Sequence, residues 1–211
     1  MKYPRALALT AALLGATVLI PGRVPAQAEP HTAVLYRESY ALEAKQDYVG
    51  ALARMREISR EAGTSYFATI RMAWLSYLAG DYAGSVASYT TAVATEPKAI
   101  EPRLGLTLTL LAARNWRELE RASRDVLVMD ARNATALARL AAAQYWGGNY
   151  AAAEATYRQL TADYPSDLDY KTGLGWTLLK LGRTAEARQF FTSVLAVSPD
   201  NSSAKQGLAV K

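Results

Sequence analysis

The chain contains no cysteine and a single histidine, His31, among its 211 residues. Without cysteine it cannot form disulfide bonds, zinc–cysteine sites, iron–sulfur clusters or a catalytic thiol. One histidine near the N-terminus argues against a histidine-rich metal site and against a Ser-His-Asp triad. We therefore expect no bound metal, no small-molecule cofactor and no enzymatic activity.

Glycine and proline are also scarce, at 13 and 8 residues, and charged residues make up only 20% of the chain. The low glycine and proline content excludes collagen-like and low-complexity chains. Because 51% of the residues are hydrophobic, the chain is too apolar to be disordered and has enough material for a large core. Its length allows one domain or two small ones.

Residues 1–28 lack any acidic residue and contain three bases, Lys2, Arg5 and Arg23. An uncharged run of 15 residues, 6–20, follows the basic start, and the small-x-small sequence ending at Ala28 follows that run. These parts predict a secretory signal peptide cleaved after Ala28 and export to a bacterial periplasm. The run is shorter than the ~20 residues needed to span a bilayer, so an N-terminal membrane anchor is the alternative.

Removing the signal peptide changes the charge of the chain. The formal net charge of +5 includes the three bases of residues 1–28, and the remainder has 21 bases and 19 acids. A net charge of +2 gives no reason to expect a nucleic-acid partner.

A period of 34 residues runs through the rest of the sequence. Five triplets begin 34 residues apart, at Gln46, Gly80, Arg114, Gly148 and Gly182, and those at Gly80 and Gly148 read Gly-Asp-Tyr and Gly-Asn-Tyr. Prolines 97, 165 and 199 share a second phase, in which Ala131 takes the place of proline. The period defines five repeats and a partial sixth: 32–65, 66–99, 100–133, 134–167, 168–201 and a capping segment 202–211.

Each repeat is predicted to form two helices, at repeat positions 1–14 and about 17–30. Apolar residues recur at helical spacing in both segments. Glycine in the triplet allows the left-handed backbone that ends the first helix, and proline ends the second helix.

This pattern resembles the tetratricopeptide repeat family over essentially the whole chain after residue 28. The family places a small residue at repeat position 8, alanine at 20, an aromatic at 24, a small residue at 27 and proline at 32. Repeat 5 follows it closely, with Gly175, Ala187, Phe191, Val194 and Pro199.

Repeats 1 and 3 depart from the family pattern. Repeat 1 has Ser39 where glycine is usual and Gly63 in place of proline, while repeat 3 has Leu119 for alanine and Ser123 for the aromatic. The resemblance nevertheless implies an all-α fold: a right-handed α-solenoid of five helix–turn–helix repeats over residues 29–211, ending in a short capping helix. Stability would come from stacking neighbouring repeats.

The resemblance also implies that the first helix of each repeat lines a concave surface. Positions 2, 5, 9 and 12–13 of these helices form an apolar and aromatic stripe, with arginine recurring at position 6 on its edge. Such a stripe predicts a groove for a protein or peptide segment that is apolar or partly acidic. The predicted binding residues are Tyr36, Tyr40, Phe67, Ile70, Arg71, Trp74, Tyr77, Leu108, Leu111, Arg139, Tyr145, Trp146, Trp176 and Lys180.

Two alternatives accompany this interpretation. The stripe residues can instead pack between neighbouring first helices. The short capping segment can leave the face of repeat 5 open for head-to-tail self-assembly into a homo-oligomer. The lysine–asparagine clamp with which some tetratricopeptide domains hold a C-terminal carboxylate is absent, since its positions carry Tyr36, Tyr40, Ile70 and Trp74. By resemblance, exported members act as scaffolds in envelope assembly, secretion or polysaccharide export.

Overall fold

The computed structural model describes residues 29–210, so the predicted signal peptide lies outside the described residues. Within this range the chain forms eleven α-helices and no strand. The helices are α1 (His31–Ala44), α2 (Tyr48–Ala62), α3 (Tyr66–Leu78), α4 (Tyr82–Thr95), α5 (Glu101–Ala112), α6 (Trp116–Met129), α7 (Ala134–Trp146), α8 (Tyr150–Asp163), α9 (Leu168–Lys180), α10 (Thr184–Val197) and α11 (Ser202–Ala209).

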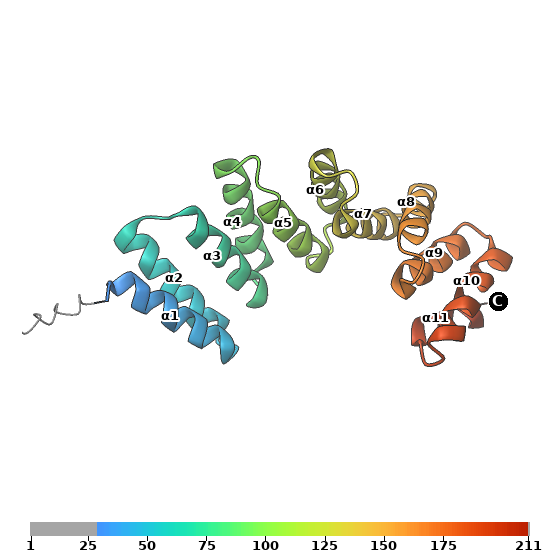
Figure 1. Cartoon of the computed structure of the whole chain (residues 1–211), viewed down its shortest axis with the longest axis horizontal. Coiled ribbons are helices and arrows are strands. Elements are labelled where there is room, and N and C mark those ends of the chain that lie inside the picture. Colours follow the sequence, from blue (N-terminus) through green and yellow to red (C-terminus); the bar gives the residue numbers. More distant parts are fainter. Residues whose placement is uncertain (1–28, 211) are drawn as a thin grey trace, which may run out of the picture.

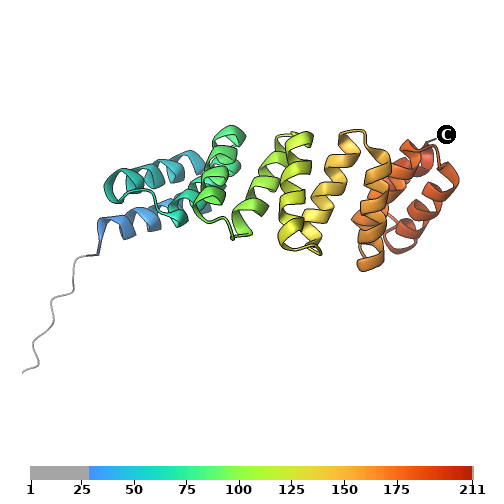
Figure 2. The same cartoon turned by 90° about the horizontal axis from the view of Figure 1, so that it is seen from above.

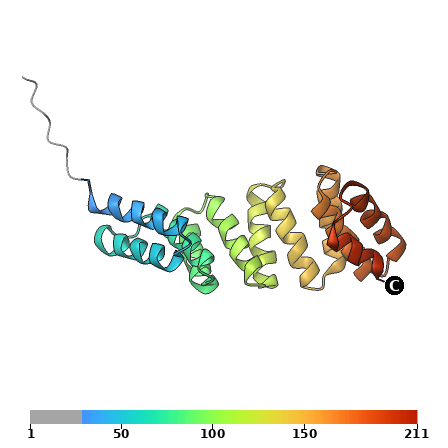
Figure 3. The ribbon, with the colours of Figure 1, turned by 90° about the horizontal axis from the view of Figure 1, so that it is seen from below.

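The predicted fold class, an all-α solenoid of five helix pairs with a capping helix, is confirmed. The helices follow one another in a single row along the molecule (Figure 1). Views from above and from below show the same row, with no helix returning to an earlier part of it (Figures 2 and 3). We call α1, α3, α5, α7 and α9 the first helices, and α2, α4, α6, α8 and α10 the second helices.

Short polar side chains define where most helices begin. Asp47, Asp81, Asn115 and Asn149 each accept a hydrogen bond from a backbone N–H in the first turn of a second helix. Such caps satisfy backbone donors that would otherwise lack a partner, and each contributes about 1 kcal/mol. These triplets therefore both end one helix and begin the next, because the residue before each cap ends the preceding helix.

That preceding residue takes a left-handed backbone in all five repeats. Glycine provides it in repeats 2, 4 and 5, with φ between 77° and 82° at Gly80, Gly148 and Gly182. In repeats 1 and 3 the same conformation is held by Gln46 and Arg114, with φ of 62° and 54°. A side chain in this region costs energy that glycine does not, so these two turns are maintained by the helices on either side.

The core is distributed along the row. Repeat positions 8 and 20 are buried in every repeat, which lets the two helices of a pair approach closely. The position-8 residues are Ser39, Ala73, Thr107, Ala141 and Gly175, and the position-20 residues are Ala51, Ser85, Leu119, Ala153 and Ala187. Because each buried cluster involves neighbouring repeats, no repeat completes its own core.

Three of the junctions between repeats depend on an aromatic ring packed on glycine. The rings of Tyr89 and Tyr157, at position 24, lie against position 6 of the next repeat, where Gly105 and Gly173 stand. A Cβ atom added at Gly105 would lie 2.3 Å from the Tyr89 ring. Phe191 makes the same contact with Gly207 of α11, and Ala204 and Gly207 are buried there. The capping helix thus continues the repeat pattern.

The first helices lie on the inner side of the row. The backbones of α3, α5, α7, α9 and α11 each come within 8 Å of the next one in this series, whereas successive second helices make no comparable approach among the described residues. A row of helices curves toward the side on which its members are closest. Among the described residues no helix is both long and apolar enough to cross a membrane.

Candidate partner-binding face

Two aromatic hollows open on the first-helix side of the molecule, one near each end of the row. The N-terminal hollow has a volume of about 190 Å³. Phe67 at its edge keeps 54% of its surface exposed, and Tyr40 keeps 49%. Its lining residues are Tyr40, Tyr66, Phe67, Ile70, Arg71, Trp74 and Glu101.

The C-terminal hollow is larger, at about 400 Å³, and has no charged lining residue. Trp146, at the end of α7, forms an exposed wall, with 62% of its surface open to solvent. Its lining residues are Tyr145, Trp146, Tyr157, Thr172, Gly173, Trp176, Ser203 and Gln206. Because Ser203 and Gln206 belong to α11, the capping helix completes this hollow.

The aromatic side chains are held in place by one another. Trp146 stacks on Trp116 with ring centroids 6.0 Å apart and meets the edge of Tyr145 at 5.1 Å. In the N-terminal half, Trp74 stacks on Tyr77 at 5.5 Å. Such contacts add about 1 kcal/mol beyond burial, so the walls are preorganised, which lowers the entropy cost of binding.

Polar contacts orient two tryptophans. Trp74 donates its indole N–H to Glu43 at 2.9 Å, and Trp176 donates to Ser203 at 2.8 Å. Burial raises the pKa of Tyr157, under the C-terminal hollow, to about 12. Its hydroxyl therefore stays protonated well above physiological pH.

Arg71 lines the N-terminal hollow, but its side chain is mostly enclosed by the fold. Only 6% of its surface is exposed. Its Nη1 pairs with Glu43 at 2.8 Å, its Nη2 donates to Ser39 at 3.0 Å, and its guanidinium lies 3.5 Å from the centre of the Tyr40 ring. Arg71 thus joins repeats 1 and 2.

Arg139 is half-buried and occupies the same repeat position in repeat 4. Its Nη1 donates to the backbone oxygen of Leu104 and to Oγ1 of Thr107, both in repeat 3. Burial lowers the pKa of Arg139 from its ordinary value. The side chain therefore spans the junction of repeats 3 and 4 while bearing a partly desolvated charge.

The structure distributes the predicted binding residues over four groups. Tyr40, Phe67, Ile70, Arg71 and Trp74 line the N-terminal hollow, and Tyr145, Trp146 and Trp176 line the C-terminal one. Tyr36 contacts Phe67 at 5.6 Å, and Tyr77 lies beside Trp74. Leu108, Leu111, Arg139 and Lys180 line neither hollow. Leu108 and Leu111 are half-buried in the middle of the row, and Lys180 is exposed.

The predicted binding residues left out several residues that line the hollows. Glu101 lies on the stripe, at position 2 of repeat 3, but was not among the predicted binding residues. Tyr66 lies outside the stripe at the start of α3, and burial together with Glu101 raises its pKa. Tyr157 comes from a second helix. Ser203 and Gln206 come from the cap, whose only predicted role was to cover the core. The prediction was based on residues of the first helices alone, whereas the hollows form where neighbouring repeats meet.

One group of three potential metal ligands lies among the described residues: His31, Glu57 and Glu61, with ligand atoms within 4.8 Å of one another. His31 Nδ1 lies 2.9 Å from Glu61, and Glu57 pairs with Arg54 at 2.9 Å. Both carboxylates thus have protein partners at an open surface. We assign no metal role to this group.

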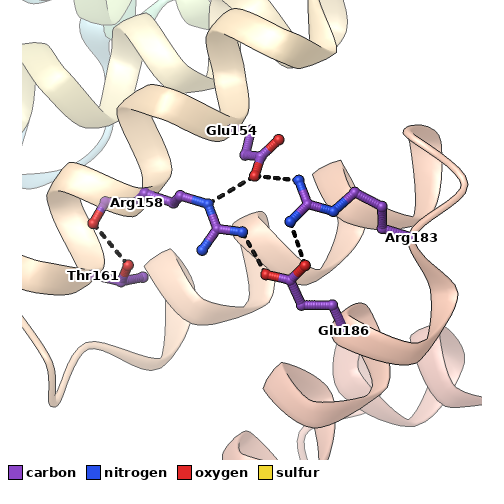
Figure 4. A network of polar contacts seen from close by, with 5 residues as sticks. All are labelled: Glu154, Arg158, Thr161, Arg183 and Glu186. Atoms are coloured by element: carbon purple, nitrogen blue, oxygen red, sulfur yellow. Dashed lines mark hydrogen bonds and ion pairs between the residues drawn. The ribbon is translucent and has the colours of Figure 1, made fainter.

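The second-helix side is charged. Four side chains of repeats 4 and 5 form a network in which Arg158 and Arg183 each pair with both Glu154 and Glu186 (Figure 4). Arg158 Nε lies 2.7 Å from Glu154. The arginines hold the pKa of both carboxyl groups below their usual range. The clustering of aromatic side chains in the two hollows makes the first-helix side the candidate binding face.

The described residues define an all-helical repeat protein, an α-solenoid of helix–turn–helix units with aromatic hollows on its inner side. Residues 139–202 match the family model of the tetratricopeptide repeat. This match covers the C-terminal part of the chain, and the fold of the described residues is similar to that of solved tetratricopeptide repeat proteins. No curated protein matches the chain by sequence.

Solved structures share the fold at low sequence identity. A tetratricopeptide repeat protein from Parabacteroides merdae superposes with a TM-score of 0.76 at 16% identity, covering 83% of this chain and 70% of that protein. MamA from Desulfovibrio magneticus gives 0.74 at 17%, over 82% of this chain and 98% of that one. YrrB, described as a tetratricopeptide repeat protein with an unusual peptide-binding site, gives 0.71 at 12%, over 83% and 91%.

Proposed function

We propose that this protein is a non-enzymatic adaptor that holds a segment of a partner protein on its first-helix face. Tetratricopeptide repeat proteins generally mediate protein–protein interactions. The observation that carries the proposal is the pair of aromatic hollows, in which Phe67 and Trp146 remain more than half exposed. Exposed aromatic clusters of this kind mark interaction sites, and tryptophan and tyrosine dominate binding energy at such sites.

The chemistry of the hollows indicates what they bind. The C-terminal hollow has apolar walls and the polar groups of Ser203, Gln206 and Thr172, which suits an apolar side chain flanked by peptide groups. The N-terminal hollow is smaller and adds the charged side chains of Arg71 and Glu101. A segment lying along the row would place one apolar side chain in each hollow.

We further propose that the chain is exported, with its N-terminus processed after Ala28, and acts in the bacterial envelope. This rests on the basic, apolar and small-x-small pattern of residues 1–28. Envelope assembly, secretion and polysaccharide export are the candidate processes. Cell fractionation with mass spectrometry of the intact protein tests this part, and an unprocessed cytosolic protein would contradict it.

The binding proposal is tested by photo-crosslinking in cells. A photoreactive amino acid replaces Phe67 or Trp146 on the binding face, and Val128 on α6, which is 88% exposed, as a matched control. We expect one discrete partner to be captured from Phe67 and Trp146 and none from Val128. Equal capture from all three positions would contradict the proposal.

Self-assembly is the second candidate. The cap has a single helix of eight residues, α11, which covers the face of repeat 5 less fully than a helix pair would. Capture of the protein by itself alone, together with a molecular mass in solution that rises with concentration, would favour this candidate. A monomer at high concentration would exclude it.

A further inference from the structure

Arg139 carries a charge that the described chain leaves uncompensated. Its Nη1 is bonded to a backbone oxygen and a hydroxyl, both uncharged. Among residues 29–210, no carboxylate forms an ion pair with it, and burial lowers its pKa. A partly desolvated cation without an anion is unfavourable, and a bound anion would relieve that cost.

The same chain contains a completed version of this arrangement. Arg71 stands at the same repeat position and also bonds the position-8 hydroxyl of the preceding repeat, Ser39. There Glu43 supplies the anion: one carboxylate oxygen accepts from Arg71 and the other from the indole of Trp74. The junction of repeats 1 and 2 thus shows how a carboxylate is held beside such an arginine.

The two residues that complete the arrangement are missing at the junction of repeats 3 and 4. Leu111 stands at the repeat position of Glu43, and Ala142 stands at that of Trp74. Thr107 retains the hydroxyl, which accepts from Arg139. Ala142 has no group that could donate to a carboxylate as the indole of Trp74 does in repeat 2, and the Nε and Nη2 groups of Arg139 make no hydrogen bond within the described chain.

We propose that Arg139 anchors an acidic side chain of the bound partner segment, in the role that Glu43 has beside Arg71. This inference rests on the proposed partner-binding function. A carboxylate can take two parallel hydrogen bonds from the free edge of a guanidinium. Trp146 lies seven residues further along α7, so two helical turns, or about 10 Å, separate it from Arg139 on one face. The partner segment therefore carries a carboxylate about 10 Å from an apolar side chain.

The experiment is an NMR titration of the full-length chain, labelled with 15N-arginine, with two synthetic peptides. One is acetyl-Phe-Gly-Gly-Glu-amide, and the other carries glutamine in place of glutamate. We expect the Nε–H signal of Arg139 to move with the first peptide, which should bind about tenfold more tightly than the second, since a charged hydrogen-bonded pair is worth about 1.5 kcal/mol or more. Equal affinities, or no binding of the glutamate peptide at millimolar concentration, would overturn the proposal.

Three variants locate the effect. Arg139→Gln removes the anchor and should abolish the discrimination. Leu111→Glu places at the junction of repeats 3 and 4 the carboxylate that Glu43 provides in repeat 1. The new side chain should pair with Arg139 and so abolish the discrimination between the two peptides, while the protein stays folded. Arg37→Gln is the matched control, because Arg37 has the same repeat position but lies exposed and paired with Glu29. Discrimination that survives in both Arg139→Gln and Leu111→Glu would refute the assignment.

The outcomes separate this inference from the function on which it rests. If crosslinking from Trp146 captures a partner but the two peptides bind equally, the adaptor function stands and the acidic anchor falls. If the peptides discriminate through Arg139 but no partner is captured from the binding face, the anion subsite is real and the adaptor function falls.

Discussion

Repeats 1 and 3 carry different residues from repeats 2, 4 and 5 at a few repeat positions, and the residues at these positions vary together. At position 24, repeats 2, 4 and 5 have Tyr89, Tyr157 and Phe191, each packed on a glycine of the next unit. Repeats 1 and 3 have Met55 and Ser123 there, and the next repeat has arginine in place of that glycine. Position 8 follows the same division, with a hydroxyl in repeats 1 and 3 and alanine or glycine in the others.

The difference shows that a junction between repeats can be built in two ways. In the aromatic junctions a ring fills the space and glycine makes room for it. In the arginine junctions no ring is present, and Arg71 or Arg139 crosses to the position-8 hydroxyl of the repeat before. The residues of repeats 1 and 3 that depart from the family pattern are therefore matched to each other, and each departure makes sense only with its partner.

The largest expected effect comes from converting one kind of junction into the other. Gly105→Arg should destabilise the protein by about 3 kcal/mol, because its Cβ would lie 2.3 Å from the buried Tyr89 ring. Tyr89→Ser alone should cost about as much by leaving a cavity. The double variant should lose about 2 kcal/mol less than the sum, since each change makes room for the other. Urea denaturation of the four proteins measures this coupling.

Tyr89→Phe is the control, because it keeps the ring and should change the free energy of unfolding by about 0.5 kcal/mol. Strict additivity of Gly105→Arg and Tyr89→Ser would mean that the two residues are not coupled, and the two junction types would then be a coincidence of sequence.

Replacing the arginine should lower the free energy of unfolding by different amounts at the two arginine junctions, and this difference is smaller than the effects above. Arg71→Met strands the partly buried carboxylate of Glu43 and should cost about 3 kcal/mol. Arg139→Met strands no charge and should cost about 1 kcal/mol, for the lost hydrogen bonds to Leu104 and Thr107. Chemical denaturation compares them. Equal losses would show that Glu43 contributes little, and would weaken its use as a model for a bound carboxylate.

The turns offer a milder test of the same division. Gln46→Gly and Arg114→Gly should each stabilise the protein by about 0.5 kcal/mol, because both residues hold a positive φ that glycine adopts without strain. Gly80→Ala, in a repeat of the other kind, should destabilise it by about 1 kcal/mol for the opposite reason. Thermal unfolding midpoints report all three, and a loss of stability in either glycine variant would show that the replaced side chain makes a compensating contact.

The repeat architecture was predictable from sequence because its signals are local. The triplets specify a turn and a helix cap through one or two residues each, and Asp81 and Asn149 perform that role as capping residues. Such signals do not depend on which repeats are neighbours. Even the turns at Gln46 and Arg114, which lack glycine, were located by the 34-residue phase alone.

The site was only partly predictable because its geometry depends on pairs of repeats. A position on a helical stripe does not reveal whether its side chain is covered, and Arg71 is covered because Glu43 and Ser39 in the previous repeat accept its hydrogen bonds. Helical periodicity treats Arg71 and Arg139 as equivalent. The residues that distinguish them are Glu43 against Leu111 at position 12 and Trp74 against Ala142 at position 9. The sequence pattern did not indicate that a carboxylate at position 12 would pair with the arginine of the next repeat.

The smallest expected change in stability comes from the charged side chains on the outer side of a junction. At the junction of repeats 4 and 5 the inner contact is the Tyr157 ring on Gly173, and the charges lie outside, in the network of Figure 4. Glu154→Gln should lower the unfolding midpoint at pH 7 by about 2 °C, because the ion pairs are partly exposed and screened by water.

The pH dependence of this effect has a definite sign. The folded-state pKa values of Glu154 and Glu186 are lowered, so their stabilising contribution is complete above the unfolded value of about 4.3 and is lost as the pH falls through the folded values. The difference between the parent protein and Glu154→Gln should therefore shrink between about pH 5 and pH 3. Arg139→Met should behave differently, since no carboxylate pairs with Arg139 in the described chain and its cost should be the same at both ends of that range. A pH-independent loss of stability in Glu154→Gln would mean that the Glu154 side chain acts through packing. A pH-dependent loss in Arg139→Met would mean that an acidic group of the chain compensates the charge of Arg139. That result would remove the reason for a partner carboxylate at the junction of repeats 3 and 4.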